Sequence, residues 1–259
     1  MSNPKISIIT AVLNCADTLK GTLDSILSQT YNNYEYIIVD GGSRDGTIDL
    51  ITEYQKKFGC KLIWTSEPDE NLYDALNKGL KMASGDIIGI LNADDFYTSN
   101  HILERIAEEM GNNPIDAIYG DVHYVDRKDI NHIVRYYSSR IFRPWLMRLG
   151  FMPAHPSFYC RKEVYQSFGT YDTSFRIAAD FELLLRIIYK GRIKTKYIPM
   201  DFVTMRRGGI STSGIKSHLQ TMKDHIHALK KNHIYSNVFI LGLRYLYKVS
   251  ELIFVKKCQ

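Results

Sequence analysis

Cysteines are few in this sequence, and none lie close together. The 259 residues contain four of them, Cys15, Cys60, Cys160 and Cys258. The absence of a C-x-x-C pair argues against a zinc knuckle and gives no sign of a disulfide framework. We therefore expect reduced thiols, as in a cytosolic protein.

Long apolar runs are also missing. No stretch approaches the ~20 consecutive apolar residues that a membrane-spanning helix requires. The first residues, MSNPK, lead into a strand pattern without an apolar signal region. The expectation from the sequence is a cytoplasmic location.

Two common nucleotide-binding fingerprints are absent. No G-x-G-x-x-G follows the first strand pattern, which weighs against a Rossmann dehydrogenase, and no G-x-x-x-x-G-K-[ST] occurs, which excludes a P-loop. Charge is nearly balanced before residue 216, with 25 basic and 26 acidic side chains, whereas residues 216–259 carry eight Lys or Arg against two acids. Because the basic surface is confined to this tail and carries no recognised motif, nucleic acid is not an expected partner.

Strand and helix patterns alternate four times before residue 113. The strand patterns cover residues 5–13, 34–39, 62–65 and 87–91, and a helical pattern follows each of them. Such alternation with short connections predicts an α/β fold. The expected core is a Rossmann-like, mostly parallel central sheet with right-handed crossovers and flanking helices.

The rest of the chain is less regular. Short strand patterns after residue 116 predict a small mixed sheet, and residues 194–205 are expected to form two strands around Pro199. Two helical patterns after residue 214 predict a C-terminal helical extension. We therefore expect a domain of residues 1–214 followed by a basic, amphipathic helical tail of residues 215–259.

The last of the four strand patterns ends in two adjacent carboxylates. Residues 87–91 carry no charge, which suits a strand buried on both faces, and Asp94 and Asp95 follow. Ligands bind beyond the carboxyl ends of strands in open α/β sheets. Paired carboxylates there repel each other unless a cation such as Mg²⁺ or Mn²⁺ lies between them, held also by substrate oxygens. The pattern indicates a metal–diphosphate site, although a turn that caps the next helix would also use these residues.

Two neighbouring strand ends carry carboxylates as well. Asp40 precedes Gly41 and Gly42, where glycines allow close approach and a carboxylate can accept a hydrogen bond from a base ring N–H. Asp69 lies in the acidic loop 67–71 after the third strand. Either residue alone would suit a turn. Three consecutive strand ends with carboxylates indicate a cation or a ligand rich in donors.

Later segments supply candidate reactive groups. Asp180 opens a helical pattern, where it is either a general base or an N-cap. His155 lies between two prolines and is either a second base or ligand, or a structural residue. Arg206 and Arg207 precede two glycines, a combination that suits a loop closing over a diphosphate or a solvated linker.

Six short motifs follow one another along the chain. They are T-A-V-L-N at residues 10–14, I-V-D-G-G-S-x-D-G-T at 38–47, S-E-P-D at 66–69, Y-D-A-x-N-K-G at 73–79, G-D-I-I-G-x-L-N-A-D-D at 85–95 and G-G-I-S-T at 208–212. In combination they resemble the inverting family 2 glycosyltransferases through about residue 213. The resemblance is strongest to the bacterial branch that builds surface polysaccharides such as O-antigen, capsule or colanic acid.

The resemblance implies a GT-A fold, a nucleotide-sugar donor that is usually a UDP-sugar, and a Mg²⁺ or Mn²⁺ ion. It implies that Asp40 binds uracil and that Asp180 is the catalytic base. Asn92 stands where the family's D-x-D-type motif has its first acid, so Asp95 is the better metal ligand and Asp94 touches ribose or metal. The expected donor-binding residues are Thr10, Ala11, Asn14, Asp40, Asp69, Asn77, Asp94, Arg206 and Arg207, and His155 is an additional candidate.

Two positions depart from the family pattern. Many relatives carry an arginine where Leu76 stands, so the contact to the diphosphate is expected from Arg206 or Arg207 instead. In the family a glutamate often precedes the aspartate that acts as the base, whereas Ala179 precedes Asp180 here.

The function expected from the resemblance is a metal-dependent, inverting transfer of a sugar. The acceptor would be a saccharide or a lipid-linked saccharide in surface polysaccharide synthesis, for example of lipopolysaccharide. One alternative is a non-catalytic nucleotide-sugar-binding protein on the same fold. Another is a sugar nucleotidyltransferase, which would usually carry a Gly-rich, cationic loop after the first strand, where residues 14–17 have neither feature.

The tail carries a separate expectation. Its last helical pattern has Phe239, Leu243 and Leu246 along one side, with Arg244 and Lys248 elsewhere. A basic amphipathic helix can lie on an anionic membrane surface, here the inner face of the cytoplasmic membrane. The alternative is a helix that packs on the domain or on a second subunit.

Overall fold

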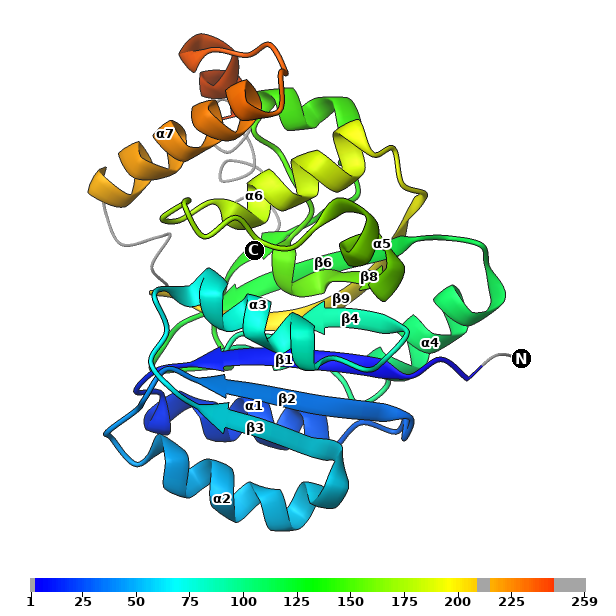
Figure 1. Ribbon diagram of the computed structural model, residues 1–259, viewed down its shortest axis with the longest axis vertical. Helices are drawn as coiled ribbons and strands as arrows, with labels where there is room; N and C mark the ends of the chain where they lie inside the picture. Colours follow the sequence, from blue (N-terminus) through cyan, green and yellow to red (C-terminus); the bar gives the residue numbers. More distant parts are fainter. Residues whose placement is uncertain (1–2, 209–214, 245–259) are drawn as a thin grey trace.

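The computed structural model describes residues 3–208 and 215–244 (Figure 1). Within these ranges nine strands form one sheet in the order β3-β2-β1-β4-β8-β6-β9-β5, and β7 pairs with β6. The α/β fold with a largely parallel central sheet and flanking helices is therefore as predicted from the alternation of strand and helix patterns.

The first half of the sheet is parallel. β1 (Ile6–Val12) lies between β2 (Tyr34–Asp40) and β4 (Ile87–Ile90), and β3 (Leu62–Ser66) pairs with β2. Their carboxyl ends therefore meet at one edge of the sheet (Figure 1). The connecting helices are α1 (Ala16–Leu27), α2 (Thr47–Phe58) with the short η1 (Gly59–Lys61), α3 (Leu72–Met82) and α4 (Ile102–Asn112).

The second half of the sheet is mixed and continues the first. The strands are β5 (Phe96–Tyr97), β6 (Ala117–Val125), β7 (Ile133–Tyr137), β8 (Phe158–Arg161) and β9 (Thr195–Arg206). The expected small mixed sheet is not separate, because β8 pairs antiparallel with both β4 and β6.

The expectation of two strands around Pro199 is wrong, since β9 is a single strand. Tyr197 pairs with Tyr119 and Asp201 pairs with Asp121, so three residues of β9 face the single residue Gly120. Proline is tolerated at such an irregularity because its missing N–H breaks no regular ladder bond there.

Shorter helices fill the second half of the chain. The helical pattern that Asp180 opens forms a helix that begins at Ala179, and from Leu185 it continues as a π-helical segment, η4. The irregular segment 140–152 contains a 3₁₀ turn. The bounds are η2 (Pro144–Leu149), η3 (His155–Ser157), α5 (Lys162–Phe168), α6 (Ala179–Leu184), η4 (Leu185–Lys190) and α7 (Ile215–Lys231).

Helices cover both faces of the sheet. On β2, Tyr36 and Ile38 belong to a core shared with α1, α2 and α4. The alternate residues Ile37 and Val39 belong to a core shared with α3, α5, α6 and α7. This alternation follows from the period of two along a strand, and it leaves the carboxyl ends of the strands as the uncovered edge.

The described part of the tail packs on the domain. Leu229 and Leu241 are buried in the core to which α6 contributes, and α7 lies over α6 (Figure 1). Residues 245–259 of the predicted tail lie outside the described residues, and the boundary at residue 214 stays a prediction. No described helix is long and apolar enough to cross a membrane. Cys15, Cys60 and Cys160 are free thiols, and Cys258 lies outside the described ranges.

Candidate functional site

Asp40 ends β2 and is fully buried. Its Oδ2 accepts hydrogen bonds from the backbone N–H groups of Gly42 and Ser43, both at 3.0 Å, and from Ser66 Oγ at 2.6 Å. Gly42 adopts a φ of 88°, so the turn that presents these N–H groups favours glycine. Asp40 Oδ1 is buried as well, and no described residue donates a hydrogen bond to it. A buried acceptor without a donor is costly, which suits this oxygen to an N–H that a ligand brings.

Asp69 lies beside the same turn. A Cβ on Gly41 would stand 3.1 Å from Asp69 Oδ2, so glycine keeps this gap open. Lys78 of α3 holds Asp69 Oδ1 at 2.7 Å and Glu67 Oε1 at 3.0 Å. The hydrogen bond to Asp69 is the main reason that the pKa of Lys78 lies above its ordinary value. Lys78 was not among the predicted site residues, although the acidic loop 67–71 signals the need for a cation.

Asp94 and Asp95 follow β4, the strand next to β1. Asp95 is only 1% exposed, and its Oδ2 accepts a hydrogen bond from Asn92 Nδ2 at 2.7 Å. Burial, and then the charge of Asp94, raise the pKa of Asp95 well above that of an ordinary aspartate, and burial raises the pKa of Asp94 too. Asn92 therefore orients Asp95 without adding a third negative charge.

This donor set fits a Mg²⁺ or Mn²⁺ ion completed by ligand oxygens. In residues 3–208 and 215–244, no three or more His, Cys, Asp or Glu side chains gather closely enough to hold a metal ion alone. Hard cations at phosphate sites need only one or two carboxylates, because phosphate oxygens and water fill the other positions. Asp94 and Asp95 supply that number, and a cation would relieve their mutual repulsion.

Arg206, the last residue of β9, reaches the same edge. Its Nη1 donates to the backbone oxygen of Asp94, and its guanidinium carbon lies 5.0 Å from the centre of the Phe96 ring. A Cβ on Gly21 would stand 2.9 Å from Arg206 Nη2, so α1 accommodates this side chain by carrying glycine. Arg207 is exposed, and its backbone N–H donates to Val125 O at 3.1 Å. Most of the G-G-I-S-T motif lies outside the described residues.

The turn after β1 is tied to the turn after β2. Asn14 has a left-handed φ of 52°. Its N–H donates to Ser43 Oγ at 2.8 Å, and its Oδ1 accepts from Arg44 N at 2.9 Å. The side-chain oxygen of Asn14 is thus used to join the two turns that flank Asp40.

Thr10 and Ala11 lie within β1. The buried Thr10 hydroxyl donates to Leu91 O at 2.6 Å and accepts from Tyr36 OH at 3.0 Å. Ala11 is half-buried opposite Val39. Both residues line the strand end, and the Thr10 hydroxyl already has its hydrogen-bond partners inside the sheet.

Cys15 shows that the strand ends share one site. Burial raises the pKa of its thiol, and the charges of Asp94, Asp45 and Asp40 act in the same direction. The thiol therefore lies near aspartates that follow both β2 and β4. Its place was not predicted, because a lone cysteine in a turn carries no functional signal.

Asp180 lies in a second cluster, on the first turn of α6. Its Oδ1 accepts a hydrogen bond from Phe181 N at 2.8 Å. Burial raises the pKa of Asp180, whereas the charge of His155 lowers it. His155 Nε2 lies 2.7 Å from Tyr171 OH, and burial lowers the pKa of His155. Burial of the ring thus favours the uncharged form of His155, whose Nε2 pairs with Tyr171 OH.

Helix α3 connects the two clusters. Asn77 Nδ2 donates to Tyr171 O at 2.8 Å, and Tyr171 N donates to Asn77 Oδ1 at 2.9 Å. Tyr73 OH donates to Ile177 O, just before α6. The same helix carries Lys78, which holds Asp69. Asn77, expected at the donor, uses its amide group to fix the segment that leads into α6.

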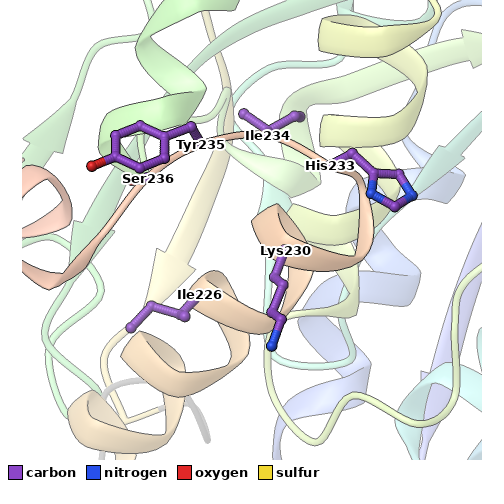
Figure 2. Close-up of a pocket in the computed structure, with 6 residues that line it drawn as sticks. All are labelled: Ile226, Lys230, His233, Ile234, Tyr235 and Ser236. Carbon is purple, nitrogen blue, oxygen red and sulfur yellow. The ribbon is translucent and has the colours of Figure 1, made fainter.

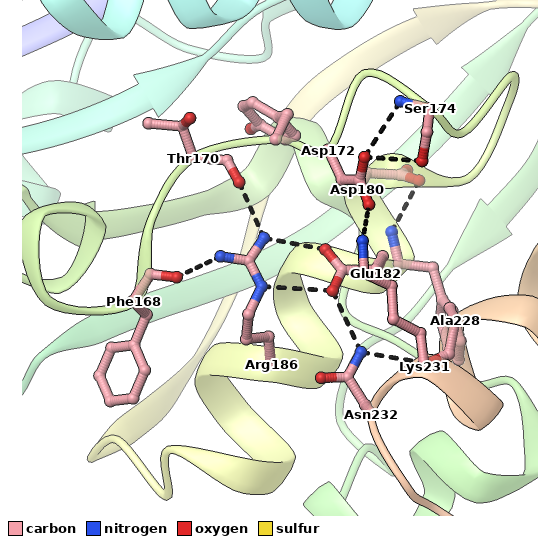
Figure 3. A network of polar contacts seen from close by, with 12 residues as sticks. Phe168, Thr170, Asp172, Ser174, Asp180, Glu182, Arg186, Ala228, Lys231 and Asn232 are labelled. Carbon is pink, nitrogen blue, oxygen red and sulfur yellow. Dashed lines mark hydrogen bonds and ion pairs between the residues drawn. The ribbon is translucent and has the colours of Figure 1, made fainter.

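Glu182 is a second carboxylate close to Asp180 in the sequence, but it is engaged elsewhere. It is 2% exposed, its Oε2 accepts from Arg186 Nη2 at 2.8 Å, and its Oε1 accepts from Asn232 Nδ2 at 3.1 Å (Figure 3). A buried carboxylate paired in this way holds elements together and is poorly suited to accept a substrate proton.

A cavity of about 320 Å³ lies in the tail (Figure 2). Its lining belongs to α7 and the residues that follow it, and includes none of the aspartates of either cluster. The lining residues are Ile226, Lys230, His233, Ile234, Tyr235 and Ser236.

Solved structures share this fold at low sequence identity. Residues 1–349 of TarS from Staphylococcus aureus, in complex with UDP-GlcNAc, match with a TM-score of 0.67 at 14% identity, over 87% of this chain and 66% of that one. The mannosyltransferase PcManGT from Pyrobaculum calidifontis, in complex with GDP-Man and Mn²⁺, matches with a TM-score of 0.63 at 15% identity, over 97% and 81%. The curled central sheet is that of GT-A glycosyltransferases.

Sequence relatives point to the same family. A PGL/p-HBAD biosynthesis glycosyltransferase of Mycobacterium bovis is 32% identical over 222 residues, which are 82% of this chain and 81% of that protein. An uncharacterised glycosyltransferase of Mycobacterium tuberculosis is 33% identical over 187 residues, 71% and 69% of the two chains. Residues 7–175, which hold all the strand-end aspartates, match the family described as glycosyl transferase family 2. The chain therefore belongs to glycosyl transferase family 2, and it is a glycosyltransferase.

Proposed function

We propose that the protein transfers a sugar from a UDP-sugar to a hydroxyl of a saccharide or lipid-linked saccharide, with inversion and with Mg²⁺ or Mn²⁺, in surface polysaccharide synthesis. The observation that carries the proposal is the buried Asp40 Oδ1, to which no described residue donates. It lies at the same sheet edge as Asp94 and Asp95. An acceptor there suits the ring N–H of uracil, and the paired carboxylates suit a cation on the diphosphate.

The named neighbours support a nucleotide-sugar donor. The TarS structure holds UDP-GlcNAc, and the PcManGT structure holds GDP-Man with Mn²⁺. Both share only the fold with this chain, so UDP is proposed from the Asp40 site, and GDP is the alternative to be tested beside it.

A single displacement accounts for the transfer. Asp180 takes the proton of the acceptor hydroxyl, and that oxygen bonds to the anomeric carbon from the face opposite the nucleotide. The bond from this carbon to the diphosphate oxygen breaks in the same step, so the configuration inverts and the nucleoside diphosphate leaves. Arg206 adds positive charge at the leaving-group edge. A metal ion held by Asp94 and Asp95 would neutralise charge on the leaving diphosphate.

Donor turnover tests this proposal. UDP-GlcNAc, other UDP-sugars and GDP-mannose are incubated with Mn²⁺ or Mg²⁺, with and without saccharide acceptors, and nucleoside diphosphate release is measured. Release from a UDP-sugar that is lost on chelation and in Asp95→Ala supports the proposal. Binding without release would instead identify a non-catalytic binding protein. Pyrophosphate release from UTP and a sugar phosphate would identify a nucleotidyltransferase.

We further propose that an anionic membrane surface presents the acceptor. Three aromatic side chains are strongly exposed: Phe239 at 88%, Tyr235 at 72% and Trp145 at 61%. The segments that carry Tyr235 and Trp145 lie side by side, because Arg148 Nε donates to Tyr235 O at 3.1 Å. Exposed aromatic groups beside basic ones are typical of proteins that lie on a membrane surface.

The described end of the tail has two different sides. Arg244, expected away from the side that carries Phe239 and Leu243, is 5% exposed, and its Nη1 lies 2.7 Å from His225 Nδ1. Together with Leu241 it faces the domain, whereas Phe239 and Leu243 are exposed. The outward side is therefore apolar, and its cations must come from neighbouring segments. Leu246 and Lys248 lie outside the described residues.

A further inference from the structure

We propose that Asp224 of α7 is a positioning residue, which holds the start of α6 and thereby the Asp180 carboxylate. This makes the tail helix part of the reaction machinery. The proposal rests on the proposed role of Asp180 as the base. Both residues lie beyond the family match, which ends at residue 175.

Asp224 caps the segment that leads into α6. Ala178 occupies the N-cap position of the helix, and its side chain makes no capping hydrogen bond. Asp224 Oδ2 accepts from Ile177 N at 2.9 Å and from Ala178 N at 3.2 Å. These two N–H groups belong to the residues just before the helix, and Asp180 follows the second of them by two residues.

Asp224 is itself held in place. It is 6% exposed, and its Oδ1 accepts a hydrogen bond from Gln220 Nε2 at 2.7 Å, one turn earlier on α7. A carboxylate whose two oxygens are both engaged at a buried contact has little freedom to move. The cap therefore transmits the position of α7 to the start of α6.

Two further contacts fix α6 on the other side of Asp180. The ring of His225 stacks on Phe181 with centroids 3.9 Å apart and planes 16° apart. Asn232 Nδ2 donates to Glu182 Oε1 at 3.1 Å, and Figure 3 shows this contact. Residues of α7 and the turn after it thus contact α6 directly before and directly after the proposed base. Displacement of the base would slow the reaction, because a shift of ~1 Å can lower the rate by up to ~10²-fold.

Groups from four elements face Asp180. They are His155 from η3, Tyr73 from α3, Tyr171 from the loop before α6, and Asp224 from α7. Burial is the main cause that raises the pKa of Asp180, and the charge of Asp224 raises it further. Removing that charge while keeping the cap should therefore lower the pKa of Asp180.

The experiment compares two variants of Asp224 with a control on the same helix. Asp224→Ala removes the cap, and we expect kcat for UDP release from UDP-GlcNAc to fall at least about tenfold with UDP affinity unchanged. Asp224→Asn keeps an oxygen for both N–H groups, so kcat at the pH optimum stays near that of the wild type. Its acid limb moves to lower pH, because the neighbouring negative charge is gone. Lys231→Met removes the ion pair with Asp172 and the contact of the ammonium group with the Phe175 ring, and it changes neither quantity.

A carboxyl NMR titration gives a readout that does not depend on the sugar. The carboxyl signal of Asp180 is assigned by its absence in Asp180→Asn. Its pKa is expected to be lower in Asp224→Asn than in the wild type and unchanged in Lys231→Met. If Asp224→Ala does not fold, this titration and the pH profile of Asp224→Asn test the positioning role without it.

Two outcomes overturn the positioning role. One is a kcat of folded Asp224→Ala no lower than that of Lys231→Met. The other is an Asp180 titration and acid limb in Asp224→Asn that coincide with those of the wild type. Asp180→Asn distinguishes a failure of the positioning role from a failure of the proposed function. Full activity of Asp180→Asn would show that Asp180 is not the base. Loss of activity in Asp180→Asn, together with normal activity of the Asp224 variants, would refute only the positioning role.

Discussion

Among single residues, Asp95 shows the conflict between folding and ligand binding most clearly. It is almost fully buried beside Asp94, and burial followed by that neighbouring charge raises its pKa well above the ordinary value. The free protein therefore holds a carboxylate where its charged form is unfavourable. A donor–metal complex would offset this cost, which is the pattern expected of a site kept for binding.

We predict that Asp95→Asn stabilises the ligand-free protein. The amide removes the buried charge and keeps an oxygen for Asn92, so the Tm should rise by about 2–4 °C at pH 7, as for a gain of roughly 1 kcal/mol. Thermal unfolding without metal measures it. Asp86→Asn, at the other end of the same strand and exposed, is the matched control and should leave the Tm unchanged. A lower Tm in Asp95→Asn would show that the charge is already compensated.

A second prediction at this scale concerns Asp180. Its raised pKa means that a larger fraction is protonated on mild acidification than for an ordinary aspartate with a pKa of ~3.9. Turnover should therefore fall with decreasing pH at a pH above that value, and Asp180→Asn should lower kcat by ~10²–10⁴ with UDP binding kept. A kcat–pH profile measures the fall in turnover on acidification, and the kinetics of Asp180→Asn measure the loss of kcat. Asp172→Asn, in the loop before α6, is the control.

Some of these residues could be predicted from the sequence and others could not. The strand ends at Asp40, Asp69 and Asp94 share one edge because parallel strands end together, and a strand pattern is enough to see this. The contacts of Asn77 with Tyr171 depend on a partner 94 positions away, and those of Asp224 with Ile177 on one 47 positions away. Pairings at such separation leave no periodic signal.

At the scale of elements, a buried carboxylate joins neighbouring strands at the edge of the sheet opposite the candidate site. Glu35 of β2 is 3% exposed and accepts hydrogen bonds from Ser7 Oγ at 2.6 Å and Ser84 Oγ at 2.7 Å, with Lys5 Nζ at 2.5 Å. Burial alone would raise its pKa, but the hydrogen bonds from Lys5, Ser7 and Ser84 outweigh it and lower the pKa to about 2. The network joins β1, β2 and the turn before β4.

We predict that Glu35→Gln lowers the free energy of unfolding by about 2–3 kcal/mol at pH 7. A depressed carboxyl pKa contributes stability above the unfolded-state value of ~4.3, and this contribution is lost as pH falls toward 2. The difference between wild type and variant in urea unfolding should therefore shrink on acidification across that window. Glu53→Gln breaks only an exposed helix pair with Lys57 and should leave stability nearly unchanged. A difference that is constant with pH would contradict the assignment.

The elements themselves differ in how far they could be predicted. The four strand–helix units follow from hydrophobic periodicity and short turns. The single β9 does not, because Pro199 in a strand normally signals a break, and only the bulge opposite Gly120 accommodates it. The π-helical η4 also has the apolar spacing of an ordinary helix, so pattern alone extends α6 through it.

For the whole molecule, one side of the described tail packs on the domain and the other side is exposed. Leu241 is fully buried while Phe239 is 88% exposed. The sequence shows an amphipathic helix but cannot say which side meets the domain, because both sides contain apolar residues. The arrangement leaves exposed aromatic groups near the basic segment 140–148, which also carries Trp145.

We predict binding to anionic vesicles at low salt that weakens at high salt, since the electrostatic part is screened. Co-sedimentation with vesicles of acidic and of neutral lipid measures it. Phe239→Ser should reduce binding, whereas Ile133→Ser, an exposed apolar residue on β7, should not. Equal recovery of the protein in the supernatant with acidic vesicles at low salt and without vesicles would refute the membrane contact.

The central claim is a nucleoside diphosphate site built on Asp40 and the Asp94–Asp95 pair. Calorimetric titration of UDP, with and without Mn²⁺, into wild type, Asp40→Asn and Asp95→Ala tests it most directly, with GDP as the comparison nucleotide. We predict binding to the wild type that requires Mn²⁺, loss of this metal-dependent binding in Asp95→Ala, and weaker UDP binding in Asp40→Asn. UDP affinity that is equal in all three proteins, or no binding of UDP under any condition, would contradict the claim.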